Sequence, residues 1–73
     1  MIKKTYAHHK PTEKALARIR LLRQEFSAIH QAVENLSPKS REQSIALTNL
    51  EQAAMWAIKA IVCNDEESEV EQL

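Results

Sequence analysis

Glycine is absent from this 73-residue chain, and cysteine occurs once, as Cys63. Phosphate-binding loops of the GxxxxGK type and dinucleotide fingerprints of the GxGxxG type need backbone conformations that only glycine allows, so both are excluded. All-β folds also rely on glycine in their tight turns, which argues against that class. A single cysteine forms no intramolecular disulfide and is typical of a reducing compartment.

Long apolar runs are lacking as well. No stretch approaches the roughly 18 uncharged apolar residues of a membrane span, and we expect no membrane partner. The basic N-terminus is not followed by an apolar run, so we do not interpret it as a signal peptide. A chain of this length rarely gains more than about 3–5 kcal/mol from a single core. Without a disulfide, its stability is expected to depend on partner chains or a metal.

The formal net charge is zero, but the charges are unevenly distributed. Residues 1–41 hold nine lysines and arginines against three glutamates, and residues 42–73 hold one lysine against seven acids, giving +6 and −6. Two antiparallel segments of opposite charge attract each other, within a chain or between chains, which is one explanation. The alternative is that the basic half faces a polyanion.

The chain after Pro11 carries apolar residues at heptad spacing. Thr12 is a suitable N-cap, so we predict a helix over residues 12–36. Its apolar seam consists of Ala15, Ile19, Leu22, Phe26, Ile29, Val33 and Leu36. Residues 1–11 are polar and basic and end in proline, which predicts an extended N-terminal arm.

A second helix is predicted to follow Pro38, which cannot continue the first. It can begin at Ser37 with proline behind it, or at a capping box formed by Ser40 and Gln43. The pattern extends to about residue 62 and is apolar nearly all round, which predicts burial against more than one neighbour. The residues expected to be buried in an assembly are Leu47, Leu50, Ala54, Trp56 and Ile61.

Together these patterns predict an all-α protein. We expect a basic arm over residues 1–11, a helical hairpin over residues 12–63 and an acidic, disordered tail over residues 64–73. No strand is predicted. The hairpins are expected to assemble into a homo-oligomeric helical bundle.

Catalytic and metal-binding patterns are missing. His8 and His9 are adjacent and Cys63 is far away in sequence, so no spacing matches a zinc site, and we expect no metal and no other cofactor. The serines stand at caps and turns, and no pair of carboxylates lies on an otherwise apolar face. The sequence therefore predicts a binding protein, not an enzyme.

Polyanion binding is supported by three residues. Tyr6 lies among lysines and histidines, and an aromatic ring beside cations suits a nucleobase joined to a phosphate. Arg41 stands in the first turn of the second helix, where backbone N–H groups favour anions; the alternative is a salt bridge to Glu42 or Glu34. Thr48 follows two turns later on the same face, and its hydroxyl can meet a phosphate or bond back to its own helix.

Residues 38–61 resemble the helical-hairpin family of phage anti-defence sponge proteins, which includes the anti-CBASS and some anti-Thoeris proteins. The positions that match in register are Arg41, Glu42, Ser44, Ala46, Thr48, Leu50, Glu51, Ala53, Ala54, Trp56 and Ala57. The arm at residues 8–11, with Arg20 and Phe26, also resembles family members. The likeness covers about residues 2–62.

This resemblance implies a function. Family members are small all-α proteins that assemble into multimers, often hexamers described as trimers of dimers. They bind the cyclic nucleotide signals of bacterial immunity and hold them intact, so that downstream effectors stay silent. The resemblance thus implies a sponge for cyclic dinucleotides, and for cyclic trinucleotides as in some members, acting in the cytoplasm of the infected bacterium.

The resemblance also implies site residues. In anti-CBASS members an arm tyrosine stacks on a base, while a basic residue of the first helix and an arginine–threonine pair of the second contact the phosphates. The matching positions are Tyr6, Arg20, Arg41 and Thr48, with Ser44 as a weaker candidate. Arg20 stands where the family resemblance leads us to expect a lysine. The positive charge is kept, but arginine presents a planar fork of donors and lysine a point charge. Arg18 and Arg23 are candidates for a separate cyclic trinucleotide site.

Two other functions remain open. A basic arm on a helical oligomer is also typical of a small nucleic-acid-binding regulator. The second helix is too apolar to serve as a recognition helix, so we expect no DNA partner. A structural coiled-coil adaptor would explain the heptad seam but would give Arg41 and Thr48 no role.

Overall fold

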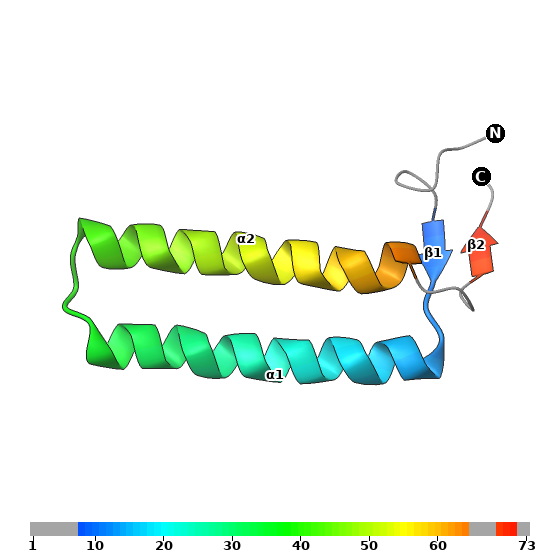
Figure 1. Cartoon of the computed structure of the whole chain (residues 1–73), viewed down its shortest axis with the longest axis horizontal. Helices are drawn as coiled ribbons and strands as arrows, with labels where there is room; N and C mark the ends of the chain where they lie inside the picture. The colour runs from blue at the N-terminus through cyan, green and yellow to red at the C-terminus, as the bar shows by residue number, and fades with distance from the viewer. Residues whose placement is uncertain (1–7, 65–68, 72–73) are drawn as a thin grey trace.

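The computed structural model describes residues 8–64 and 69–71. These residues form two antiparallel helices, α1 (Glu13–Leu36) and α2 (Arg41–Asn64), joined by a short turn (Figure 1). Two short strands, β1 (His8–Lys10) and β2 (Glu69–Glu71), lie side by side at the end of the hairpin opposite the turn. The predicted all-α hairpin is confirmed, and the strands are an addition to it.

The first helix begins where its cap residue predicts. Thr12 has an extended backbone, and its hydroxyl oxygen accepts a hydrogen bond from the N–H of Ala15 at 3.2 Å. At the other end, the N–H of Ser37 donates to the carbonyl of Val33 at 3.1 Å. Pro38 cannot extend the helix, because its ring removes the N–H and clashes with the preceding turn. Both predicted ends of α1 are confirmed.

The second helix uses the later of its two possible caps. The N–H of Gln43 donates to the hydroxyl oxygen of Ser40 at 3.1 Å. The other half of the predicted capping box is not formed, because the Gln43 side chain turns away from Ser40 and donates to the carbonyl of Ser37 at 2.9 Å. Gln43 therefore ties the start of α2 to the end of α1. The helix ends at Asn64, two residues beyond the prediction.

The two helices pack along a single narrow line of side chains, most of which stay partly exposed to solvent. Among the described residues, Ala15 and Ile19 are fully buried, with 3% and 4% of their surface exposed. Half-buried residues continue the contact along both helices: Leu22, Phe26, His30 and Val33 on α1, and Leu47, Leu50, Ala54, Ala57 and Ile61 on α2. A single hairpin therefore buries little apolar surface, and none of the described residues of α2 is fully buried.

In the single hairpin, the line of contact on α1 departs from the predicted heptad seam after Phe26. Ile29 is 49% exposed and Leu36 is 86% exposed, while His30 and Ser37 are half-buried. An α-helix without supercoiling has 3.6 residues per turn, so it drifts by about 20° per heptad relative to a strict seven-residue repeat. The line of contact with α2 therefore moves on by one residue after Phe26.

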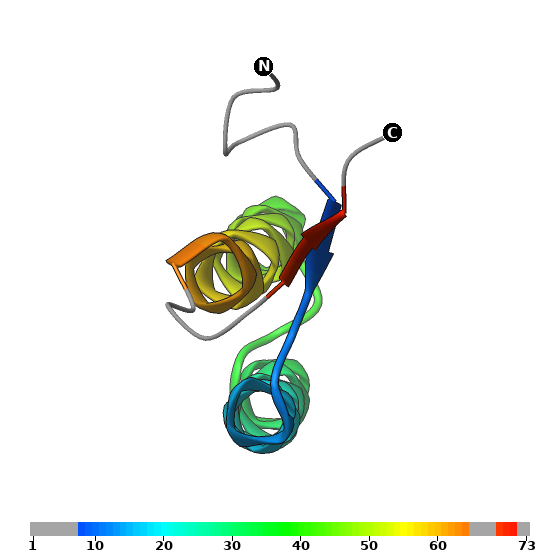
Figure 2. The same ribbon diagram turned by 90° about the vertical axis from the view of Figure 1, so that its right-hand side faces the viewer.

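The strand pair was not predicted. β1 pairs antiparallel with β2, with His8 opposite Glu71, His9 opposite Val70 and Lys10 opposite Glu69. Figure 2 shows both strands beside the C-terminal end of α2. Within the predicted arm, residues 8–10 form β1. Within the predicted tail, Asn64 is the last residue of α2 and Glu69–Glu71 form β2.

Candidate functional site

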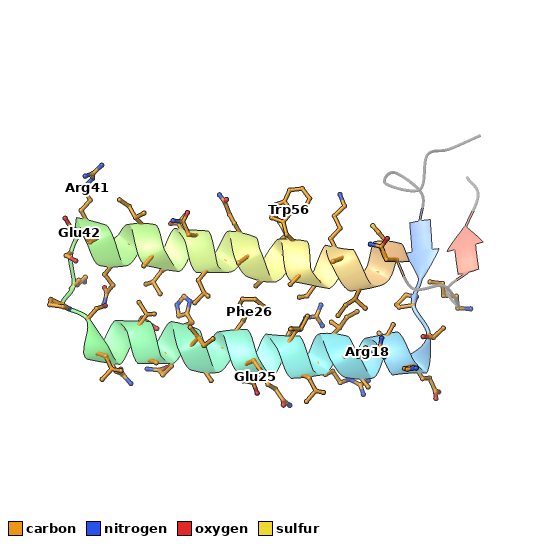
Figure 3. All side chains as sticks on the ribbon, in the orientation of Figure 1. Arg18, Glu25, Phe26, Arg41, Glu42 and Trp56 are labelled. Atoms are coloured by element: carbon orange, nitrogen blue, oxygen red, sulfur yellow. The ribbon has the colours of Figure 1, made fainter. Side chains whose placement is uncertain are left out.

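The polar line predicted on the second helix lies on the surface of α2. Arg41, Ser44 and Thr48 are spaced by three and four residues, so they share one face of the helix. All three are exposed. The opposite face of α2 packs on α1, and Figure 3 shows Arg41 and Trp56 projecting from α2 on the side away from α1. A ligand can therefore approach this line from solvent.

Two of these three residues keep a hydrogen-bond donor available. Within the described chain Arg41 makes no ion pair, and Glu34 lies instead 3.4 Å from the imidazole of His30. No hydrogen bond of the Thr48 hydroxyl is formed to any described residue, whereas Ser44 donates to the carbonyl of Ser40 at 3.1 Å. Phosphate oxygens accept hydrogen bonds, so Arg41 and Thr48 suit an anion better than Ser44 does.

An apolar patch adjoins the polar line. Ile45, Met55 and Trp56 are 45%, 59% and 60% exposed. The Lys59 ammonium lies 5.4 Å from the centroid of the Trp56 ring, in a cation–π contact. Exposed apolar patches rimmed by polar residues mark interaction surfaces. The predicted burial of Trp56 concerns an assembly, and in the single chain it stays a prediction.

Arg20, the candidate on the first helix, lies far from Arg41. It is exposed on α1, sixteen residues before the last residue of that helix. At 1.5 Å per residue this is roughly 24 Å along the axis from the turn, after which Arg41 begins α2. One hairpin therefore does not bring Arg20 and Arg41 together. Tyr6 lies outside the described residues, and its stacking role stays a prediction.

Arg18 and Arg23 are both exposed on α1. Five residues apart, they point about 140° from each other around the helix axis. A shallow hollow on α1 is lined by Arg23, Gln24, Ser27, Ala28 and Gln31. Arg23 alone of the two arginines contributes to it, so one helix does not gather the pair into a single site.

The groove between the helices is a poor anion site. Its lining consists of Phe26, Ser27, His30, Leu50, Glu51 and Ala54. Glu51 places a carboxylate there, and a second one, Glu34, contacts His30. Carboxylates carry the same sign of charge as a phosphate and therefore repel it. Across residues 8–64 and 69–71, no three His, Cys, Asp or Glu side chains gather as metal ligands.

Two features of this surface escaped the sequence analysis. The bond from Gln43 to Ser37 fixes the start of α2, and hence the direction of Arg41, across the turn. The sequence does show a glutamine three residues after the cap serine Ser40, but Gln43 bonds to Ser37, the cap residue at the end of α1. β2 was missed because a Glu-Val-Glu segment has no distinguishing apolar pattern.

The fold and its surface define a small helical binding module, with anion donors on an exposed helix face. The family model described as "Acb2/Tad1, hairpin domain" matches residues 1–62, and the chain belongs to this family of anti-CBASS and anti-Thoeris sponges. This confirms the resemblance carried by residues 38–61. Membership implies a cyclic-nucleotide sponge, and the family consists of non-enzymatic binding proteins. No curated protein and no solved structure matches the chain. No helix in the described parts is long and apolar enough to cross a membrane.

Proposed function

We propose that this protein binds cyclic dinucleotide immune signals, sequesters them and releases them unaltered. The family match over residues 1–62 is the observation that carries the proposal. The chemistry of α2 supports it, because the planar guanidinium of Arg41 suits a phosphodiester and the Thr48 hydroxyl adds a neutral donor. On this proposal the protein acts in the cytoplasm of a phage-infected bacterium, where such signals are made.

We infer that the binding site is shared between chains. A single hairpin holds Arg20 near the strand end and Arg41 at the turn end, roughly 24 Å apart along the helix axis. In a two-fold antiparallel pair of hairpins, the strand end of one chain lies beside the turn end of the other. Such a pair would bring Tyr6 and Arg20 of one chain toward Arg41 and Thr48 of its partner.

Assembly is also favoured by the surface of the chain. A hairpin of this size needs further buried area, and Trp56 offers it on the side of α2 away from α1, with the exposed Met55 next to it in sequence. We propose a hexamer arranged as a trimer of dimers, the form that the family resemblance implies. Cyclic trinucleotides would then occupy a second site. Since Arg18 and Arg23 point apart on one helix, that site would draw on more than one chain.

A thermal-shift panel tests the function. The purified protein is heated with cyclic dinucleotides, cyclic trinucleotides and linear DNA in parallel. A ligand at a thousandfold excess over its dissociation constant stabilises the folded state by about 4 kcal/mol, which raises the Tm. Shifts with cyclic nucleotides alone support the proposal. A shift with linear DNA alone would favour a nucleic-acid-binding regulator, and no shift with any cyclic nucleotide would overturn the proposal.

Point variants test the site. Arg41→Ala should weaken binding by about 1.5–3 kcal/mol, the worth of a hydrogen bond to a charged group. Tyr6→Ala should cost about 1–3 kcal/mol, the usual worth of base stacking. Lys39→Ala is the matched control, because it removes an exposed cation two residues from Arg41. The assembly should persist in all three, and unchanged affinity in Arg41→Ala or Tyr6→Ala would show that this residue is misplaced in the site.

A further inference from the structure

The two end segments of the chain hold half of its positive excess and most of its negative excess. Residues 1–11 hold three lysines and no acid, and residues 65–73 hold five acids and no base. The described residues of both segments meet, since β1 comes from the basic segment and β2 from the acidic one. The family match ends at residue 62, so β2 lies outside the hairpin domain.

The register of the strands places residues of the acidic segment opposite residues of the basic one. Lys10 stands opposite Glu69, and His8 stands opposite Glu71. Figures 1 and 2 show the two strands side by side next to the end of α2, at the same end of the hairpin as the start of α1. Backbone pairing therefore holds β2, from the acidic segment, against β1, from the basic segment.

We infer that β2 is a strap that holds β1 in the ligand-free protein and makes binding selective; this rests on the proposed function. A pair of three-residue strands is marginally stable by itself, so a ligand that competes for β1 can displace β2. A linear polyanion attracted mainly by charge meets the acids of the strap, which weaken that attraction. The strap thus favours compact cyclic nucleotides over linear polyanions.

Three double variants of the full chain separate the strap from its charge. In V70P/E71P, prolines remove two successive N–H groups, one of which bonds across an antiparallel pair, and the second proline also removes the Glu71 charge, a loss for which E69Q/E71Q is the control. E69Q/E71Q keeps the backbone and removes two charges from the strand. E66Q/E67Q is the matched control, with the same charge change just before β2.

Each protein is measured in two ways. Amide hydrogen exchange over residues 8–10 reports the strap without any ligand. Titrations with 3′,3′-cyclic GMP–AMP and with inorganic polyphosphate at two salt concentrations report anion binding. The exchange assay and the polyphosphate titration do not depend on the sponge function. They still decide the strap if no cyclic nucleotide binds, a result that would count against the proposed function alone.

We expect exchange over residues 8–10 to be about fivefold faster or more in V70P/E71P and near wild type in both glutamine variants. Polyphosphate affinity should rise about three- to tenfold in V70P/E71P, which releases the acidic strand, and in E69Q/E71Q, which removes two of its charges, and less than twofold in E66Q/E67Q. The inference is overturned by unchanged exchange in V70P/E71P, by equal effects of the two glutamine pairs, or by unchanged or lower polyphosphate affinity in V70P/E71P.

Discussion

Replacing Trp56 by alanine tests whether the outer face of α2 is an interface between copies of this chain. Trp56 is 60% exposed in the single hairpin. Since a tryptophan buries up to about 250 Å² in an interface, covering the exposed part would remove about 150 Å² from water. At about 25 cal/mol per Å² this is roughly 4 kcal/mol for each tryptophan. We expect the dissociation constant of the assembly to rise by about a hundredfold or more, as at other tryptophan hot spots.

Sedimentation over a range of protein concentrations measures this change directly. Thermal unfolding gives a second readout, because a hairpin that fully buries only Ala15 and Ile19 among its described residues should lose stability when it dissociates. Its Tm should therefore rise with protein concentration, as it does for obligate oligomers. Trp56→Phe is the matched control, since it keeps an aromatic ring and most of the apolar area.

Two results would refute this reasoning. A well-folded wild-type monomer at micromolar concentration, with a Tm independent of concentration, would remove the assembly. Equal association of Trp56→Ala and the wild type would show that an assembly exists but leaves Trp56 uncovered.

Three further substitutions test the hairpin by chemical denaturation. Ile19→Ala should lower the free energy of unfolding by about 2–5 kcal/mol, because Ile19 is buried, whereas Leu36→Ala at an exposed position of the single hairpin should change it by less than about 0.5 kcal/mol. Equal costs would mean that another chain covers Leu36. Thr12→Ala should cost about 1 kcal/mol through the lost cap, while Thr48→Ala, within a helix, should cost far less; equal costs would deny Thr12 its capping role. Gln43→Ala should cost about 1 kcal/mol by releasing the turn, and no cost would mean that its bond to Ser37 is not needed.

The helices and their caps could be predicted because they depend on neighbouring residues. The hydroxyls of Thr12 and Ser40 accept hydrogen bonds from N–H groups three residues further on, so both partners of each bond lie within one short segment of the sequence. The seam is different, since its position depends on how straight α1 is. A heptad template assumes supercoiling, and for that reason the predicted seam includes Ile29 and Leu36, which are exposed in the single hairpin.

The site could be predicted only in part. Helical spacing places Arg41, Ser44 and Thr48 on one face, and the exposure of all three agrees. The spacing does not say that Ser44 donates to its own helix while Thr48 makes no such bond among the described residues. The separation of Arg20 from Arg41 follows from the length of the helices and the position of the turn. β1 pairs with β2 across nearly the whole chain, and no local pattern indicates such a pair.

The last prediction is that a bound cyclic nucleotide is recovered intact. The family consists of non-enzymatic binding proteins, and the exposed face of α2 offers donors for a phosphate. Sequestration without turnover needs tight binding, and a dissociation constant of about 1 nM corresponds to roughly −12 kcal/mol. Arg41 and Thr48 of one chain do not supply this alone, which is why we propose a site that draws on two chains.

The ligand is bound at a known ratio to protein, the protein is denatured by heat, and the supernatant is analysed by chromatography. An intact cyclic nucleotide in full yield, with uptake that stops at a fixed number of ligands per assembly, fits a sponge. The Arg41→Ala variant is the control for retention, because a dissociation constant about 10- to 150-fold higher should let it retain less ligand than the wild type when free ligand is washed away. A linear product that accumulates beyond one equivalent per site would make the protein an enzyme, since only turnover exceeds the number of sites.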